Sequence, residues 1–191
     1  MRVIAGTRKG LRLQVPPGHI VRPTPDRVRE ALMSILGGFF DGEQVLDLCA
    51  GTGAMGIELL SRGCGEAVFV EQGADALRAL RANLAKARFD LTSAPRAEVV
   101  ASSLPQALSA LKKRGARFDY VYVDPPYDAG LYTATLSALA DGALLRGGAE
   151  IWVESRVGLD LTTLPAGLSH QRARRFGGTT LDLLTYGTHD D

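Results

Sequence analysis

Two short stretches of the chain combine residue types that are typical of ligand-binding and catalytic sites. In the first, Asp47 stands four positions before Gly51 and six before Gly53. The second, Asp124-Pro125-Pro126-Tyr127, joins a carboxylate to an aromatic ring through two consecutive prolines. Glycine lets a ligand approach the backbone closely, whereas proline fixes φ. The first stretch therefore favours ligand binding, and the second favours a rigid loop that presents acceptor groups.

The glycine stretch allows two interpretations. Residues 51–56 fit G-x-G-x-x-G, and Glu71 follows Gly51 by 20 positions, which is the spacing of a dinucleotide-binding turn. Asp47 argues against a dinucleotide, because a carboxylate there would repel a pyrophosphate and attract the ammonium group of a cofactor that contains an amino acid. Glu71 ends a predicted strand, where a carboxylate can accept hydrogen bonds from both ribose hydroxyls of an adenosyl group. We therefore expect a nucleotide-type cofactor at Asp47, Ala50, Gly51, Gly53 and Glu71.

The Asp-Pro-Pro-Tyr stretch follows a predicted strand, at the end where α/β sheets present their ligands. Prolines have no N–H group to donate, so the loop is rich in acceptors. The Asp124 carboxylate and the Pro125 carbonyl suit the N–H groups of an exocyclic amine on a nucleobase, and the Tyr127 ring can stack on the base. We expect the catalytic residues to be Asp124, Pro125, Pro126 and Tyr127. The alternative is a rigid strand-to-helix turn without chemistry.

Both stretches resemble known motifs. Asp47, Gly51 and Gly53 are similar to the E/D-x-x-x-G-x-G cofactor loop of class I S-adenosylmethionine-dependent methyltransferases, and residues 124–127 resemble the [N/D]-P-P-[Y/F/W] motif of amino-methyltransferases. The stretch Arg22-Pro-Thr-Pro-Asp-Arg-Val-Arg-Glu30 resembles the RsmD family, which are bacterial 16S rRNA (guanine-N2) methyltransferases. Further similarity lies in residues 3–6, 10–13, 151–155 and 174–177.

The resemblance implies a reaction and a partner. A methyl group would pass from S-adenosylmethionine to the N2 amine of a guanine in 16S rRNA of the small ribosomal subunit, with Asp124 beside both amine and cofactor. The family often carries Asp or Asn near the adenine, where this chain has Ala101-Ser102-Ser103. We therefore expect Ser102 and Ser103 at the cofactor. The family also implies a monomer.

The net charge of +1 hides an uneven distribution. Residues 1–40 carry +5 and the remainder carries −4, and a further basic cluster comprises Arg172, Arg174 and Arg175. A basic N-terminal arm is typical of phosphate binding. We expect RNA contacts from Arg8, Lys9, Arg12, Arg22 and Arg27. The alternatives are a solvated face and, for Arg22 and Arg27, a structural role.

The elements that would position these residues alternate along the chain. Hydrophobic periodicity predicts short strands at 3–5 and 11–15, which form a hairpin, and a helix at 25–36. Seven further strands are expected at 44–48, 67–70, 98–101, 120–123, 150–154, 169–176 and 180–186. Helices are expected from the glycine turn to about residue 61, at 74–87, from the strand at 98–101 through about residue 113, and at 131–139.

This order predicts an α/β fold of the Rossmann-like class I methyltransferase kind, because strands that alternate with helices form mostly parallel sheets. The sheet would have seven strands, with an antiparallel strand near one edge. We expect residues 1–40 to form a basic hairpin-and-helix extension and residues 41–191 to form the methyltransferase domain.

Composition excludes several other classes. Two cysteines and three scattered histidines offer no metal cluster, and no apolar run approaches the ~18 residues of a membrane span. We expect a cytoplasmic protein. The alternative functions are methylation of adenine or another base in RNA or DNA, a non-catalytic RNA-binding assembly factor, and an NAD-dependent oxidoreductase.

Overall fold

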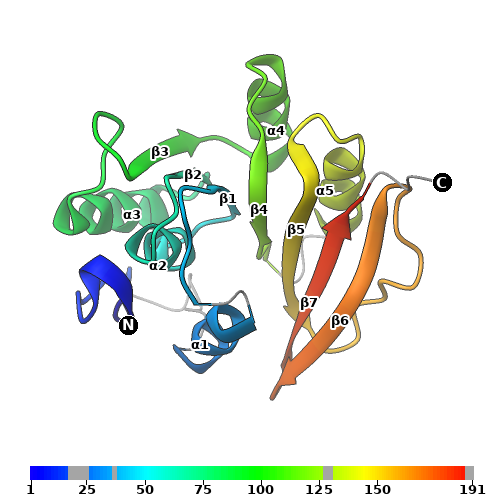
Figure 1. The fold of residues 1–191 in the computed structure, drawn as a ribbon, viewed down its shortest axis with the longest axis horizontal. Coiled ribbons are helices and arrows are strands. Elements are labelled where there is room, and N and C mark those ends of the chain that lie inside the picture. The colour runs from blue at the N-terminus through cyan, green and yellow to red at the C-terminus, as the bar shows by residue number, and fades with distance from the viewer. Residues whose placement is uncertain (17–25, 36–37, 127–130, 188–191) are drawn as a thin grey trace. The chain divides into compact units, whose positions relative to one another are not determined.

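The computed structural model describes residues 1–16, 26–35, 38–126 and 131–187. Strands alternate with helices along the chain, which divides into two compact units, Met1–Ser103 and Leu104–Asp191 (Figure 1). The described residues of 1–40 lie in the first unit. The boundary expected after residue 40 stays a prediction.

The first unit is built on three parallel strands in the order β3-β2-β1. Its strands are β1 (Gln44–Leu48), β2 (Glu66–Glu71) and β3 (Arg96–Ala101), and its helices are η1 (Gly6–Arg8, a 3-10 turn), α1 (Asp26–Ile35), α2 (Ala54–Ser61) and α3 (Ala74–Ala87). Four consecutive residues of β1 and of β2 are buried. Such continuous burial is typical of parallel strands that are covered on both faces.

The second unit carries four strands in the order β4-β5-β7-β6. Its elements are α4 (Leu104–Lys113), β4 (Phe118–Val123), α5 (Leu131–Ala140), β5 (Leu145–Arg156), β6 (Leu168–Phe176) and β7 (Thr179–Tyr186). Strand β5 runs parallel to β4, whereas β7 runs antiparallel to both β5 and β6. Figure 1 shows the red β7 between β5 and the orange β6. The antiparallel strand near one edge is therefore confirmed.

The N-terminal hairpin is shorter than the alternating pattern predicts. Its strands reduce to one antiparallel bridge, Arg2–Arg12, and the amide of Val3 donates to the Leu11 carbonyl at 2.9 Å. The strands are short because the next backbone amides bind a side chain and not the opposite strand. Those of Ile4 and Ala5 donate to the carboxylate of Glu58 at 2.7 and 3.0 Å.

Glu58 is a fully buried acid on α2, and it joins three segments of the first unit. Besides the two amides, its carboxylate accepts a hydrogen bond from Arg62 Nε at 2.7 Å and lies 3.6 Å from Arg29 Nη1 of α1. Arg29, also fully buried, donates through Nη2 to the Arg2 carbonyl at 2.7 Å. Glu58 thus fixes the N-terminal segment and α1 against α2.

None of the described helices is long and apolar enough to span a bilayer.

We predict that Glu58→Gln destabilises the protein by about 3–5 kcal/mol, because it leaves two arginines in or near the core without their carboxylate. The matched control is Glu66→Gln, which removes the exposed pair with Arg96 (3.1 Å) and should cost under about 1 kcal/mol. Urea unfolding measures both. Equal losses of unfolding free energy in the two variants would show that Glu58 does not hold the N-terminal segment and α1 against α2.

Candidate active site

The glycine turn links the end of β1 to the start of α2. Its backbone takes positive φ at Cys49 (60°), Gly51 (57°) and Gly53 (76°). The amide of Gly53 donates to the Ala50 carbonyl at 2.7 Å, which closes the turn. A Cβ added to Gly53 would lie 2.3 Å from Leu80 Cδ1. The left-handed conformation therefore favours glycine at position 53, and a larger residue there would also displace the end of the Leu80 side chain.

Asp47 lies beneath this turn and is only 1% exposed. Its Oδ2 accepts a hydrogen bond from the amide of Gly56, in the first turn of α2, at 3.0 Å. Burial raises the pKa of Asp47 to about 7; the Gly56 hydrogen bond opposes this shift and the charge of Glu71 adds to it. The described contact of Asp47 is thus to the helix, and its attraction for a cofactor ammonium stays a prediction.

Glu71 ends β2 on the other side of the turn and is half-buried. Its Oε2 accepts a hydrogen bond from the Gly51 amide at 2.8 Å, and its Oε1 accepts from Gln72 and Gly73 at 2.8 and 2.7 Å. The Ser102 amide, just after β3, donates to the Glu71 carbonyl at 3.0 Å. The first unit therefore brings Gly51, Glu71 and Ser102 together at the carboxyl ends of its strands.

The residues of this turn fit an adenosyl-type cofactor. A carboxylate has about four lone-pair sites, so Glu71 retains about one acceptor site, enough for one ribose hydroxyl, after its three backbone bonds. Gly51 carries no side chain beside it, which leaves the backbone open. Ser103, next to Ser102, is half-buried and adds a hydroxyl at the same edge.

The Asp-Pro-Pro loop begins where β4 ends, in the second unit. Asp124 is half-buried, Pro125 is buried and Pro126 is exposed, whereas Tyr127 lies outside the described residues. The hydroxyl of Tyr132, on α5, lies 3.0 Å from the Glu154 carbonyl oxygen and 3.5 Å from that of Pro125. The shorter bond goes to Glu154, so the Pro125 carbonyl keeps acceptor capacity for an amine.

The cations of the N-terminal arm differ in their surroundings. Arg8 donates through Nε to the Ala87 carbonyl at 2.6 Å, and its guanidinium lies 5.0 Å from the centroid of the Phe89 ring. Lys9 and Arg12 are exposed. Arg22 and the side chain of Arg27 lie outside the described part of the chain. Of the five cations predicted to contact RNA, Lys9 and Arg12 are therefore the two that the structure places at the surface, where Arg2 is also exposed.

Three supporting residues were not predicted from the sequence. Glu58 and Asn83 are polar residues on apolar helix faces, which is a signal that could have identified them. Asn83 donates to the carbonyls of Thr52 (2.9 Å) and Gln14 (3.0 Å) and accepts from the Gln14 amide (2.7 Å). It thereby ties the N-terminal segment to the glycine turn. Tyr132 follows an apolar pattern and gives no such signal.

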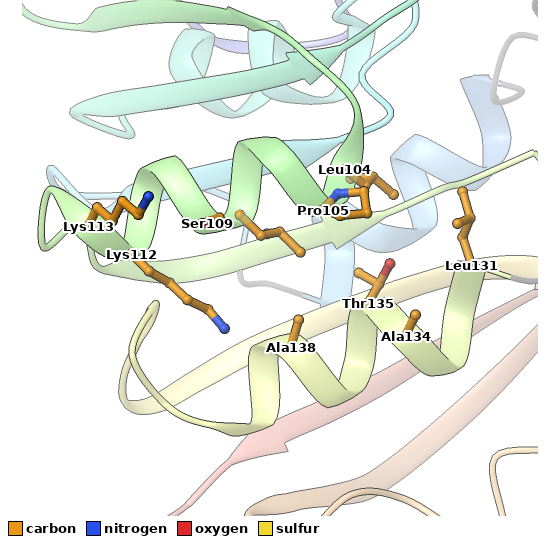
Figure 2. A pocket seen from close by; sticks show the side chains of 10 residues that line it. Leu104, Pro105, Ser109, Lys112, Lys113, Leu131, Ala134, Thr135 and Ala138 are labelled. Atoms are coloured by element: carbon orange, nitrogen blue, oxygen red, sulfur yellow. The ribbon is translucent and has the colours of Figure 1, made fainter.

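A cavity of about 380 Å³ opens between α4 and α5 of the second unit. Figure 2 shows its apolar side chains, among them Leu104 and Leu131, with Lys112 and Lys113 at one end. None of the predicted site residues lines it. Within the described ranges, no group of three or more His, Cys, Asp or Glu side chains could hold a metal ion.

The buried carboxylate makes a pH-dependent contribution to stability that can be measured. Because the folded pKa of Asp47 is about 7 and its ordinary value is 3.8, the folded state holds a proton that the unfolded state has lost between these values. Stability due to Asp47 is therefore full below about pH 4 and falls as the pH rises towards 7. We predict that wild type loses on the order of 2 kcal/mol relative to Asp47→Asn between about pH 5 and 8.

Urea unfolding across this pH range measures the difference. The control is Asp90→Asn: hydrogen bonds from Thr92 lower the pKa of this exposed carboxyl, so it stays ionised throughout the range. Parallel curves for wild type and Asp47→Asn would contradict the placement of Asp47.

The chain matches known proteins over nearly its whole length. The family model described as "Conserved hypothetical protein 95" matches residues 1–185. The "Ribosomal RNA small subunit methyltransferase D" of Escherichia coli K12 is 38% identical over 177 residues, which are 93% of this chain and 85% of that protein. The "Putative rRNA methyltransferase YlbH" of Bacillus subtilis is 34% identical over 179 residues, 94% and 95% of the two chains.

Solved structures that are similar to this chain are also described as methyltransferases or methylases. The "Putative methyltransferase yhhF" from Escherichia coli aligns with a TM-score of 0.83 at 35% identity and covers 98% of each chain. The "putative methylase HI0767" from Haemophilus influenzae aligns with a TM-score of 0.78 at 28% identity, over 98% of this chain and 99% of that one. The Rossmann-like class I methyltransferase fold is thereby confirmed. The chain belongs to the Conserved hypothetical protein 95 family, which is the RsmD family of ribosomal RNA methyltransferases that its motifs resemble.

Proposed function

We propose that this chain is an S-adenosylmethionine-dependent methyltransferase that modifies the N2 amine of a guanine in 16S rRNA. The observation that carries the proposal is the half-buried Glu71 carboxylate, which three backbone amides hold beside the open backbone of Gly51. Small-subunit rRNA is inferred as the substrate from the name of the Escherichia coli relative, a ribosomal RNA small subunit methyltransferase. The guanine N2 amine is inferred from the resemblance of residues 22–30 to the RsmD family.

The first unit supplies the residues for the cofactor. Glu71 would accept a hydrogen bond from a ribose hydroxyl at its remaining acceptor site, and Ser102 and Ser103 would lie towards the adenine. Asp47 acts from beneath by holding the first turn of α2 through Gly56. When bound, S-adenosylmethionine supplies an electrophilic methyl group.

The second unit supplies the residues for the target base. The guanine would be unstacked from its RNA loop, which is cheap for a loop nucleotide. Its N2 amine would donate hydrogen bonds to the Asp124 carboxylate and the Pro125 carbonyl, while Pro126 stiffens the loop and Tyr127 stacks on the base. Positioning is the main contribution. The Asp124 charge would also stabilise the positive charge that develops on the nitrogen.

Recognition of the RNA would involve the basic N-terminal extension, residues 1–40. Lys9 and Arg12 are exposed and suited to phosphate oxygens. Arg8 would act through its hydrogen bond to Ala87 and its contact with Phe89, by setting the position of the arm. We further propose that the protein acts as a monomer in the cytoplasm, on the small ribosomal subunit or its rRNA.

The decisive test is to identify the product. Labelled S-adenosylmethionine is incubated with the protein and with small subunits or naked rRNA from a strain that lacks this activity, and the rRNA is digested to nucleosides. We expect label in N2-methylguanosine. Label in N6-methyladenosine would overturn the base assignment, and no incorporation on any of these substrates would favour a non-catalytic RNA-binding factor.

We predict that Asp124→Ala lowers methyl transfer by at least about 100-fold, because misplacement of the amine alone has an effect of that size. Cofactor affinity, measured by calorimetry, should stay close to that of wild type. The control is Asp119→Ala, at the other end of β4, where the carboxylate pairs with Arg146 at 3.5 Å on the surface. An equal loss of cofactor affinity in Asp124→Ala would contradict its assignment to the amine.

A further inference from the structure

Strand β6 forms an exposed, basic edge of the second unit. Its residues Gln171 to Arg175 are all exposed. Among the described strands it pairs with β7, which leaves its other side open. A strand edge with unpaired backbone groups is a place where natural proteins concentrate charge, so the basic residues alone do not indicate a partner.

The two arginines at 172 and 174 have a defined arrangement. They are opposite Leu183 and Leu181 of β7, so they lie on the same face of the sheet, two residues and about 7 Å apart along the strand. Within the described ranges, no ion pair or side-chain hydrogen bond engages either guanidinium. Arg175 points to the other face, and its Nε donates to the Gly177 carbonyl at 3.0 Å.

The register of the sheet relates this pair to the catalytic loop of the same unit. Val123, the last residue of β4, is opposite Val153 of β5, and the next row across the sheet contains Glu154, Leu181 and Arg174. Asp124 follows Val123 directly and therefore stands at the level of Arg174. Three interstrand spacings separate these positions, about 14 Å.

At this distance, Asp124 and the arginine pair could contact neighbouring parts of the same RNA. A nucleotide bound at Asp124 is connected to its neighbours by phosphates that must leave the site along the surface. Arginine binds phosphate oxygens in a bidentate manner. Acidic groups near the pair are already engaged: the Glu154 carboxylate accepts a hydrogen bond from the Tyr122 hydroxyl, and Asp182 lies 2.8 Å from His170 on the opposite face.

We infer that Arg172 and Arg174 on β6 bind phosphates of the substrate RNA that flank the target nucleotide, as a contact surface separate from the N-terminal arm. The inference rests on the proposed function, because it takes the base held at Asp124 to belong to RNA. It assigns a role to Arg172 and Arg174 of the C-terminal basic cluster, which belong neither to the N-terminal arm nor to the Asp-Pro-Pro loop.

The test compares two double variants that each remove two positive charges. Arg172→Ala/Arg174→Ala changes the β6 edge. Lys113→Ala/Arg146→Ala changes the last residue of α4 and the start of β5, at the opposite end of the strands. Filter binding to an unmodified 16S rRNA transcript at several KCl concentrations gives the slope of log K against log salt. For the β6 variant we expect the slope to fall by about 1.4 to 1.8, the value for two lost phosphate contacts.

A third variant, Arg172→Lys/Arg174→Lys, retains the charge and should retain most of the slope. Methyl transfer to the same RNA should show a raised KM and an unchanged kcat for the β6 alanine variant. If wild type methylates the RNA and the two alanine variants have the same slope and KM, the inference is wrong and the proposed function stands. If wild type neither methylates nor binds the RNA, both fail.

Discussion

A buried carboxylate needs hydrogen bonds and positive charges from the protein in place of water. In the first unit Glu58 is such a carboxylate, and the groups that surround it come from three segments of the chain. Desolvating a charge costs several kcal/mol unless hydrogen bonds and counter-charges replace the water. Glu58 obtains them from the amides of Ile4 and Ala5 and from Arg62, with Arg29 nearby. Buried ion pairs of this kind often add little to stability, but they select one arrangement of the segments that they join. Here that arrangement is the N-terminal segment against α2.

The same arrangement links the basic arm to the glycine turn. Helix α2 begins at Gly53, and Asp47 holds its first turn through Gly56. Asn83 of α3 connects Gln14 directly to Thr52 within the turn. The exposed cations Lys9 and Arg12 therefore stand on a segment whose position is set at both ends by the helices around the glycine turn. Under the proposed function, this places RNA recognition and cofactor binding on one continuous framework.

The sequence predicted the regular elements well, because their signals are local. The helix predicted at 74–87 begins and ends at the same residues in the structure. Leu77, Leu80 and Leu84 recur at helical spacing, and Gly73 immediately precedes the first helical residue. Strand β5 begins five residues earlier than predicted, because Arg146-Gly147-Gly148 has no apolar pattern. The hairpin was predicted too long for a different reason: the acceptor that competes for its amides, Glu58, lies more than 50 residues away in sequence. Local patterns cannot contain such distant partners. The contact of Tyr132 with the Glu154 carbonyl, 22 residues away in sequence, is not visible in them either.

Two carboxylates at one turn give a physical reason to prefer a cationic cofactor to a dinucleotide. The sequence alone left this choice to the position of Asp47. In the structure, Glu71 lies on the open side of the turn and Asp47 beneath it, and the charge of Glu71 contributes to the raised pKa of Asp47. The two groups therefore repel each other, so Asp47, with its pKa of about 7, is only partly ionised at neutral pH, and the negative potential that a ligand in the turn would meet comes mainly from Glu71. A pyrophosphate would add like charge to this site, whereas a sulfonium and an ammonium would relieve the repulsion. The G-x-G-x-x-G spacing is thus compatible with both ligands, and the carboxylates discriminate between them.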